Sequence, residues 1–136
     1  MRRPESGTSL VEGLVATVVA LVAALALIFA LVSANAGVKS MRIERGAFLV
    51  GQQQMERLIA KPANDPDLTA GSHGPQSAAL PYVAGQTTWN VSWVDDPLDG
   101  TSPLDTSPQD YKQLQVTVTW TDVISRSVAL TTYLYP

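Results

Sequence analysis

An uninterrupted apolar run near the start of the chain limits what the protein can fold into more than any other feature. The run covers residues 14–32, and its only polar member is Thr17. At about 1.5 Å per residue, a helix of this length matches a hydrocarbon core of about 30 Å. We therefore expect one membrane-spanning helix, which leaves only a small domain for the rest of the 136 residues.

A carboxylate, Glu12, stands two residues before this run. A charged side chain costs roughly 2.5–3.5 kcal/mol at the centre of a bilayer on insertion scales, and less near its edge. Residues of this kind usually mark a function. We therefore take Glu12 as a candidate functional residue rather than as part of the anchor.

Composition excludes several function classes. There is no cysteine, so the chain has no disulfide, no cysteine-type zinc site and no thiol nucleophile. The only histidine, His73, lies among Gly and Pro residues that predict a loop, and no phosphate-loop, dinucleotide or zinc-protease motif is present. We expect no catalytic residues, no cofactor and no enzymatic activity.

Charge is unevenly distributed. The basic residues that follow the apolar run are expected to meet lipid headgroups or a neighbouring subunit. These residues are Lys39, Arg42, Arg45, Arg57 and Lys61. The distal part is acidic and offers no basic face, so no nucleic-acid partner is expected.

The helix should continue well beyond the apolar run. No strong helix breaker occurs before Pro62, which predicts one helix from about Thr8 to Ala60. Its second half is amphipathic, and we expect one stripe to pack on a sheet. The stripe consists of Met41, Phe48, Gln52, Met55 and Ile59.

Three strands are predicted after the helix. The segment Ala63–Thr88 is rich in Pro, Gly, Ser and Asp, which is typical of a loop. Alternating apolar and polar residues then predict strands at Trp89–Val94, Leu114–Trp120 and Ser127–Tyr135. The expected fold class is α+β, with the long helix packed on a small antiparallel sheet of about three strands, whose exposed edges could take an added strand.

An acidic connection between the first two predicted strands is a weak calcium candidate. Its five aspartates could supply oxygen ligands, although the spacing of an EF-hand is absent. They are Asp95, Asp96, Asp99, Asp105 and Asp110. A solvated acidic loop is the competing interpretation, and no metal is assigned.

A short basic leader ends at Gly7, the segment Ser9–Glu12 follows, and the apolar run begins with Leu14–Ala16. This N-terminus resembles the class III leader of type IV pilins and type II secretion pseudopilins. The segments Gln53–Leu58 and Val116–Trp120 are similar to minor pilins of the PilV type and their GspI counterparts.

The resemblance implies a precursor, a processing site and an assembly role. Prepilin peptidase would cut between Gly7 and Thr8, and Glu12 would become the fifth mature residue. In a stack of subunits its carboxylate could pair with the new α-amino group of a neighbour, which would set axial register. The implied partners are other minor and major pilins or pseudopilins, prepilin peptidase, the inner-membrane assembly platform and the lipid bilayer.

The resemblance also implies a domain organisation and a location. Residues 1–7 would be the leader, 8–36 the transmembrane and assembly half of the helix, and 37–136 the amphipathic half-helix with the β head. The protein would sit in the bacterial inner membrane as a single-pass subunit and then enter a periplasmic or extracellular filament.

Differences from the family favour a minor subunit over a major one. Thr8 stands where Phe or Met is common and where the amine is methylated, the membrane half of the helix has no proline, and no disulfide closes a C-terminal loop. Two alternatives stay open. Ala34–Ala36 fits a signal-peptidase site that would release a soluble domain beginning at Gly37, and the run could be a plain signal anchor.

Overall fold

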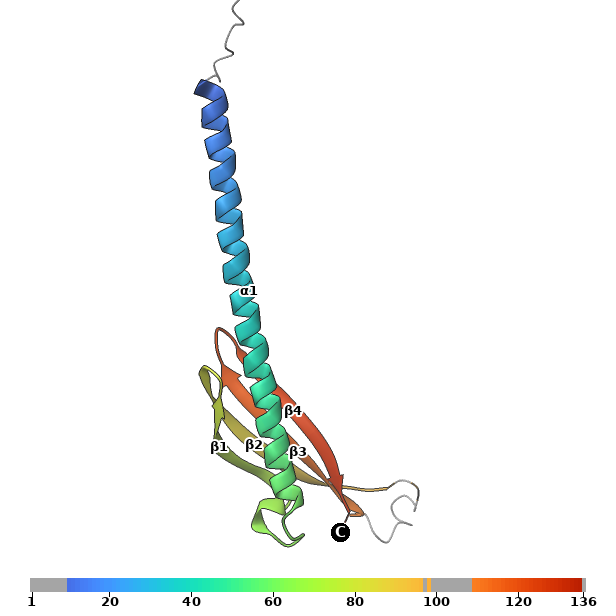
Figure 1. The fold of residues 1–136 in the computed structure, drawn as a ribbon. Helices are drawn as coiled ribbons and strands as arrows, with labels where there is room; N and C mark the ends of the chain where they lie inside the picture. The colour runs from blue at the N-terminus through green and yellow to red at the C-terminus, as the bar shows by residue number, and fades with distance from the viewer. Residues whose placement is uncertain (1–9, 97, 99–108, 136) are drawn as a thin grey trace, which may run out of the picture. The chain divides into compact units, whose positions relative to one another are not determined.

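The computed structural model describes residues 10–96, 98 and 109–135. In chain order these residues form helix α1, a single 3-10 turn η1 and strands β1 to β4 (Figure 1). The chain divides into two compact units, residues 1–39 and 40–136, which are described in turn.

Helix α1 runs from Leu10 to Ile59 and accounts for all the described residues of the first unit. Its C-terminal end lies one residue before the predicted end at Ala60, whereas the predicted start at Thr8 lies outside the described residues. Among the described residues α1 is the one helix long and apolar enough to cross a membrane, and none of its most apolar window is buried. The predicted long helix is confirmed.

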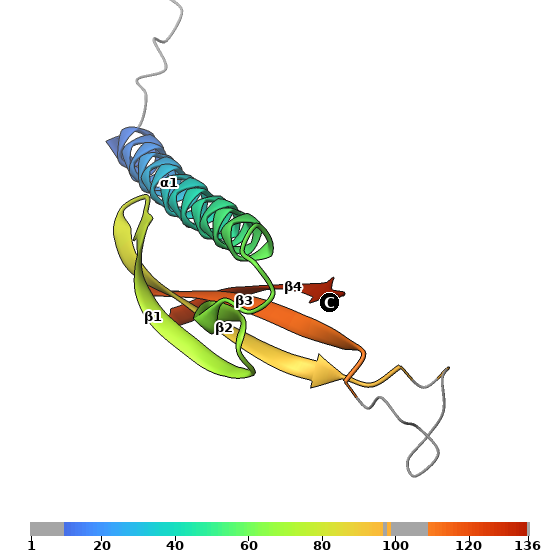
Figure 2. The same ribbon diagram turned by 90° about the horizontal axis from the view of Figure 1, so that it is seen from below.

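The second unit contains a four-stranded antiparallel sheet. The strands are β1 (Gly71–Leu80), β2 (Val83–Val94), β3 (Tyr111–Thr121) and β4 (Ser125–Leu134), and they lie in the order β1-β2-β3-β4. The 3-10 turn η1 (Pro66–Leu68) precedes β1. Residues 40–59 of α1 lie on one face of this sheet (Figure 2), so the predicted α+β class is correct.

The strand count and the predicted loop are wrong. The segment Ala63–Thr88 contains η1, all of β1 and the first part of β2, which makes four strands rather than about three. Three of the Gly and Pro residues that suggested a loop, Gly71, Gly74 and Pro75, occupy the edge strand β1. Gly74 and Pro75 lie where the pairing register with β2 shifts, and edges and bulges are the positions where strands tolerate such residues.

Two buried clusters hold the helix to the sheet. One lies near the β1–β2 turn and the other near η1. The first contains Ile43, Ala47, Ala78, Leu80, Val118 and Trp120, and the second contains Leu58, Leu68, Trp89, Val91, Leu114 and Val116. The alternation predicted for β3 is confirmed, because its buried residues are Leu114, Val116, Val118 and Trp120.

The helix packs on the sheet, but not through the predicted stripe. Met41 is 73% exposed, Phe48 42% and Ile59 47%, and Gln52 is also exposed, while Met55 is partly buried. The buried face consists of Ile43, Ala47, Gly51, Gln54 and Leu58.

Small residues explain this choice of face. A Cβ atom added to Gly51 would lie 2.8 Å from Leu130 Cδ1, and one added to Gly46 would lie 2.6 Å from Pro81 Cδ. The helix therefore approaches the sheet where Gly and Ala allow close contact, with Ile43 and Leu58 buried on the same face, whereas Met41, Phe48 and Ile59 stay exposed.

Candidate functional site

The candidate assembly residue Glu12 lies in the first turn of α1 and is exposed. The N-terminal end of a helix carries a partial positive charge, so a carboxylate in this turn is favoured by the helix itself. Its apolar neighbours Leu10, Val11 and Leu14 are 84%, 65% and 60% exposed. Glu12 thus stands beside apolar surface that its own chain leaves uncovered.

The apolar run of α1 has its one polar side chain satisfied within the helix. The Thr17 hydroxyl donates a hydrogen bond to the Gly13 carbonyl oxygen at 2.8 Å. This pattern lets a threonine enter an apolar medium without an unpaired donor. The segment is therefore suited to lipid or to the packing of other helices.

The predicted processing residues Gly7 and Thr8 lie outside the described residues. The cleavage site stays a prediction from the sequence, and so does the spacing between Thr8 and Glu12.

The structure brings together two of the five calcium-candidate aspartates. Asp110 Oδ2 accepts a hydrogen bond from the Asp96 amide at 2.7 Å, and Asp96 Oδ1 accepts one from the Leu98 amide at 3.0 Å. These carboxylates cap backbone groups at the base of the β2–β3 connection. Asp95 also lies there, whereas Asp99 and Asp105 fall outside the described residues, and within residues 10–96, 98 and 109–135 no group of three metal-ligating side chains occurs.

Three tyrosines gather beside this connection. Tyr111 packs edge-on against Tyr133, with ring centroids 5.4 Å apart, and at a tilt against Tyr135 at 5.5 Å. Desolvation raises the pKa of the Tyr111 hydroxyl, and the nearby Asp96 carboxylate adds to the effect. The hydroxyl therefore stays protonated at neutral pH and serves packing.

His73 lies in strand β1, not in a loop as predicted. Its ring stacks on Trp89, with centroids 5.6 Å apart and planes 8° apart, and its Nε2 lies 2.8 Å from the Thr69 carbonyl oxygen. Because a carbonyl oxygen can only accept, Nε2 carries the proton in this contact. The imidazole is thus held in place by the fold.

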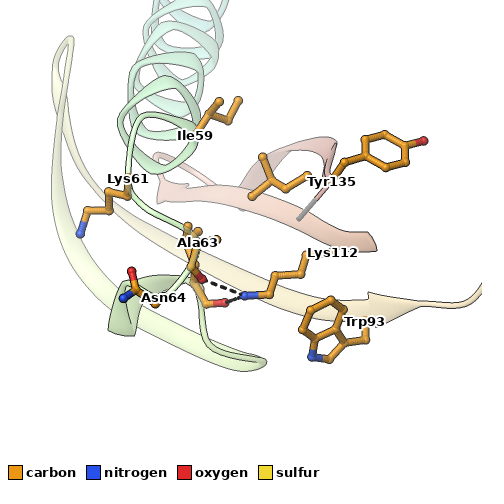
Figure 3. Close-up of a pocket in the computed structure, with 9 residues that line it drawn as sticks. Ile59, Lys61, Ala63, Asn64, Trp93, Lys112 and Tyr135 are labelled. Carbon is orange, nitrogen blue, oxygen red and sulfur yellow. Dashed lines mark hydrogen bonds between the residues drawn. The ribbon is translucent and has the colours of Figure 1, made fainter. Parts of the chain in front are cut away.

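A hollow of about 470 Å³ lies at the end of the sheet where η1 and the C-terminus meet (Figure 3). Lys112 Nζ donates hydrogen bonds to the carbonyl oxygens of Ala63 (3.2 Å) and Leu68 (2.9 Å) and lies 4.9 Å from the centre of the Trp93 ring. The ammonium group therefore fastens the segment after α1 to the sheet. The rest of the lining is largely apolar and includes Ile59, Leu134 and Tyr135.

An ion-pair cluster of Lys61, Asp65 and Asp67, called here the Lys61 clip, lies within the same segment. Lys61 Nζ lies 3.1 Å from Asp65 Oδ1 and also contacts Asp67 Oδ2. The hydrogen bond to Asp67, and then that to Asp65, raises the pKa of Lys61. The Asp67 backbone amide, followed by Lys61, lowers the pKa of Asp65, so Lys61 and Asp65 are both charged at neutral pH.

Sequence reasoning missed this clip and the Lys112 contacts. A signal for the clip was present, since Lys61 and Asp65 are four residues apart. No local pattern predicts that Lys112 reaches Ala63, because the two residues are 49 positions apart in the chain.

The chain matches no protein-family model, no curated protein and no solved structure.

Proposed function

We propose that the protein is a minor pilin or pseudopilin of the PilV or GspI type, a structural subunit that primes or caps a type IV pilus or a type II secretion pseudopilus. One observation carries the proposal. A carboxylate, Glu12, occupies the first turn of an apolar helix whose surface is left bare, and this helix leads into a small α+β head.

The proposed mechanism is assembly. Prepilin peptidase removes residues 1–7, which leaves Thr8 with a free α-amino group. The bare surface of residues 14–32 then packs among sister helices, and the Glu12 carboxylate pairs with the amine of a neighbouring subunit. Two charges that are each costly in an apolar medium become a pair, which fixes the axial position of one subunit against the next.

The first test is the mature N-terminus, measured by intact mass and N-terminal sequencing of protein from its native membrane. A start at Thr8 supports prepilin processing. A start at Gly37 would instead indicate a secreted domain, and an intact Met1 would indicate a plain membrane anchor; either outcome contradicts the proposal.

The second test removes the carboxylate. Glu12→Ala should leave membrane insertion and folding of the head unchanged but reduce incorporation into filaments by at least about tenfold, as expected for losing one buried charge pair of more than about 1.4 kcal/mol. Glu56→Ala, which removes an exposed carboxylate from the same helix, is the matched control. Incorporation of Glu12→Ala at the control level would rule out the proposed role of this residue.

A further inference from the structure

Helix α1 covers the sheet unevenly and leaves strand β4 only partly covered. The buried side chains of the sheet come from β1, β2 and β3, whereas those of β4 that face the helix are only half-buried. These are Val128, Leu130, Thr132 and Leu134. A hollow of about 440 Å³ lies at the Val128 end of this row, lined by Met41, Phe48 and Val128 together with Glu44 and Arg45.

The opposite edge of the sheet, β1, is interrupted near its middle as a pairing edge. Pro75 has no N–H group to donate, Gly74 adopts a φ of +95°, and the register with β2 shifts between His73 and Gln76. The β1–β2 turn also reaches the helix, because Arg42 Nη1 donates to the Tyr82 hydroxyl at 3.1 Å.

Strand β4 has none of these protections along most of its length. Its register with β3 is regular from Ser125 to Leu134, and it contains neither Gly nor Pro. Its one charged residue, Arg126, lies near the start of the strand and donates to Ser40 Oγ at 2.8 Å. In the described part of the chain β4 pairs only with β3, so alternate backbone N–H and C=O groups face outward along residues 127–134.

We propose that the outer edge of β4 binds an extended segment of a different protein, which adds a fifth strand to the sheet. The edge supplies backbone hydrogen bonds, and the half-buried side chains of Val128, Leu130 and Leu134 select apolar residues at every second position of the segment. The charged groups nearby are of both signs, since Glu44 and Arg45 line the hollow and Asp122 and Arg126 lie close together in the sequence near the start of β4. The favoured partner therefore has alternating apolar and polar residues and little net charge.

A second copy of this chain does not fit the outer edge of β4 in the same way. Its β1 edge is interrupted at Gly74 and Pro75, which leaves β4 as its one regular edge, and two β4 edges pair by a twofold axis that makes the strands antiparallel. Strand β4 and residues 40–59 of α1 run in broadly the same direction (Figure 1). Such a pair would place the residue-40 ends of the two heads at opposite ends of the joined sheet, whereas in two chains anchored in one membrane both of these ends are connected to spans in the same bilayer. This inference needs a membrane anchor but not prepilin processing.

The test uses the full chain in detergent and a synthetic probe. The probe is a blocked peptide of alternating valine and threonine with a polyethylene glycol tail, and its control has every second amide N-methylated, which removes the donors of one edge. Because the chain has no cysteine, single nitroxide labels can be attached to Ala129→Cys on β4 and to Ala79→Cys on β1. Both alanines are exposed and lie on edge strands, so the two variants are matched.

The probe should immobilise the label at position 129 but not at 79, and should slow hydrogen exchange of outward-facing β4 amides by about tenfold or more. The N-methylated peptide should do neither. Thr131→Cys provides a second label on the same exposed face if the first variant folds poorly.

Three outcomes would overturn the inference. Equal effects at positions 79 and 129 would indicate adsorption without edge selectivity, and equal binding of the N-methylated peptide would exclude strand pairing. A disulfide between copies of Ala129→Cys in native membranes would identify a second copy as the occupant. None of these results depends on Glu12, so they are separate from a failure of the assembly proposal.

Discussion

Single charged residues serve two different purposes in this chain. The Glu12 carboxylate is exposed at the start of an apolar helix, where its proposed partner belongs to another subunit. The ammonium group of Lys61, in contrast, is engaged within its own head by Asp65 and Asp67. The first charge should therefore affect assembly without affecting the stability of the head, and the second should do the reverse.

The Lys61 clip predicts how the stability of the head depends on pH. The pKa of Asp65 is lowered from 3.8, so its contribution is present above that value and is lost as pH falls through the lower folded-state pKa. The pKa of Lys61 is raised from 10.5, so its contribution is present below that value and is lost as pH rises through the higher folded-state pKa. The clip should stabilise the head evenly between about pH 5 and 9.

Lys61→Gln should therefore lower the free energy of unfolding by a constant amount across that window, and the difference from wild type should shrink at both ends. Urea titrations at a series of pH values measure this. Some acid dependence should remain in the variant, because the largest influence on Asp65 is the Asp67 backbone amide rather than Lys61. Arg57→Gln is the control, since Arg57 contacts the Gln54 amide oxygen. A difference that is the same at pH 2 and pH 7 would contradict the assigned coupling.

At the scale of elements, close approach decides how helix α1 meets the sheet. Gly51 faces Leu130 and Val118, and a Cβ atom there would lie 2.8 Å from the first and 3.5 Å from the second. Hydrophobic periodicity ranks residues by apolar character and so favours Met41 and Phe48, whereas packing in the fold favours the side chains that let two backbones come together. Both Met41 and Phe48 remain exposed as a result.

Gly51→Leu should destabilise the head by about 1–3 kcal/mol, because the added side chain overfills this contact. The gain in helix propensity over glycine, up to about 1 kcal/mol, offsets only part of that loss. Gln52→Leu adds an apolar side chain at the next, exposed position and should change stability by less than about 0.5 kcal/mol. Chemical denaturation of both variants measures the contrast, and equal stabilities would mean that the helix does not pack on Gly51.

Local patterns predicted the elements whose own residues determine them. The long helix and strands β2 to β4 follow from apolar periodicity and were expected within a few residues, apart from the early start of β2. Strand β1 could not be read from Gly74 and Pro75, because its pairing with β2 overrides the local preference of those residues. The same holds for the candidate functional residues. The position of Glu12 near the start of the helix was expected from the sequence, whereas the contacts of Lys112 arise only in the folded chain.

At the scale of the whole molecule, the two compact units place different demands on their surroundings. Both buried clusters lie entirely within residues 40–136, and the apolar window of the first unit buries none of its surface. The head should therefore fold without help from the apolar segment, and the apolar segment should need lipid, detergent or neighbouring helices.

A fragment of residues 40–136 should thus be soluble without detergent and unfold cooperatively, with a free energy within about 1 kcal/mol of that of the head in the full chain. A shorter fragment that begins at Gly51 lacks Ile43 and Ala47, both fully buried. It should fail to fold, because the first buried cluster then loses both of the side chains that the helix contributes to it. Circular dichroism and size-exclusion chromatography of the two fragments make the comparison. Aggregation of the longer fragment would mean that residues 10–39 stabilise the head. That result would contradict the prediction that residues 40–136 fold independently of the apolar segment.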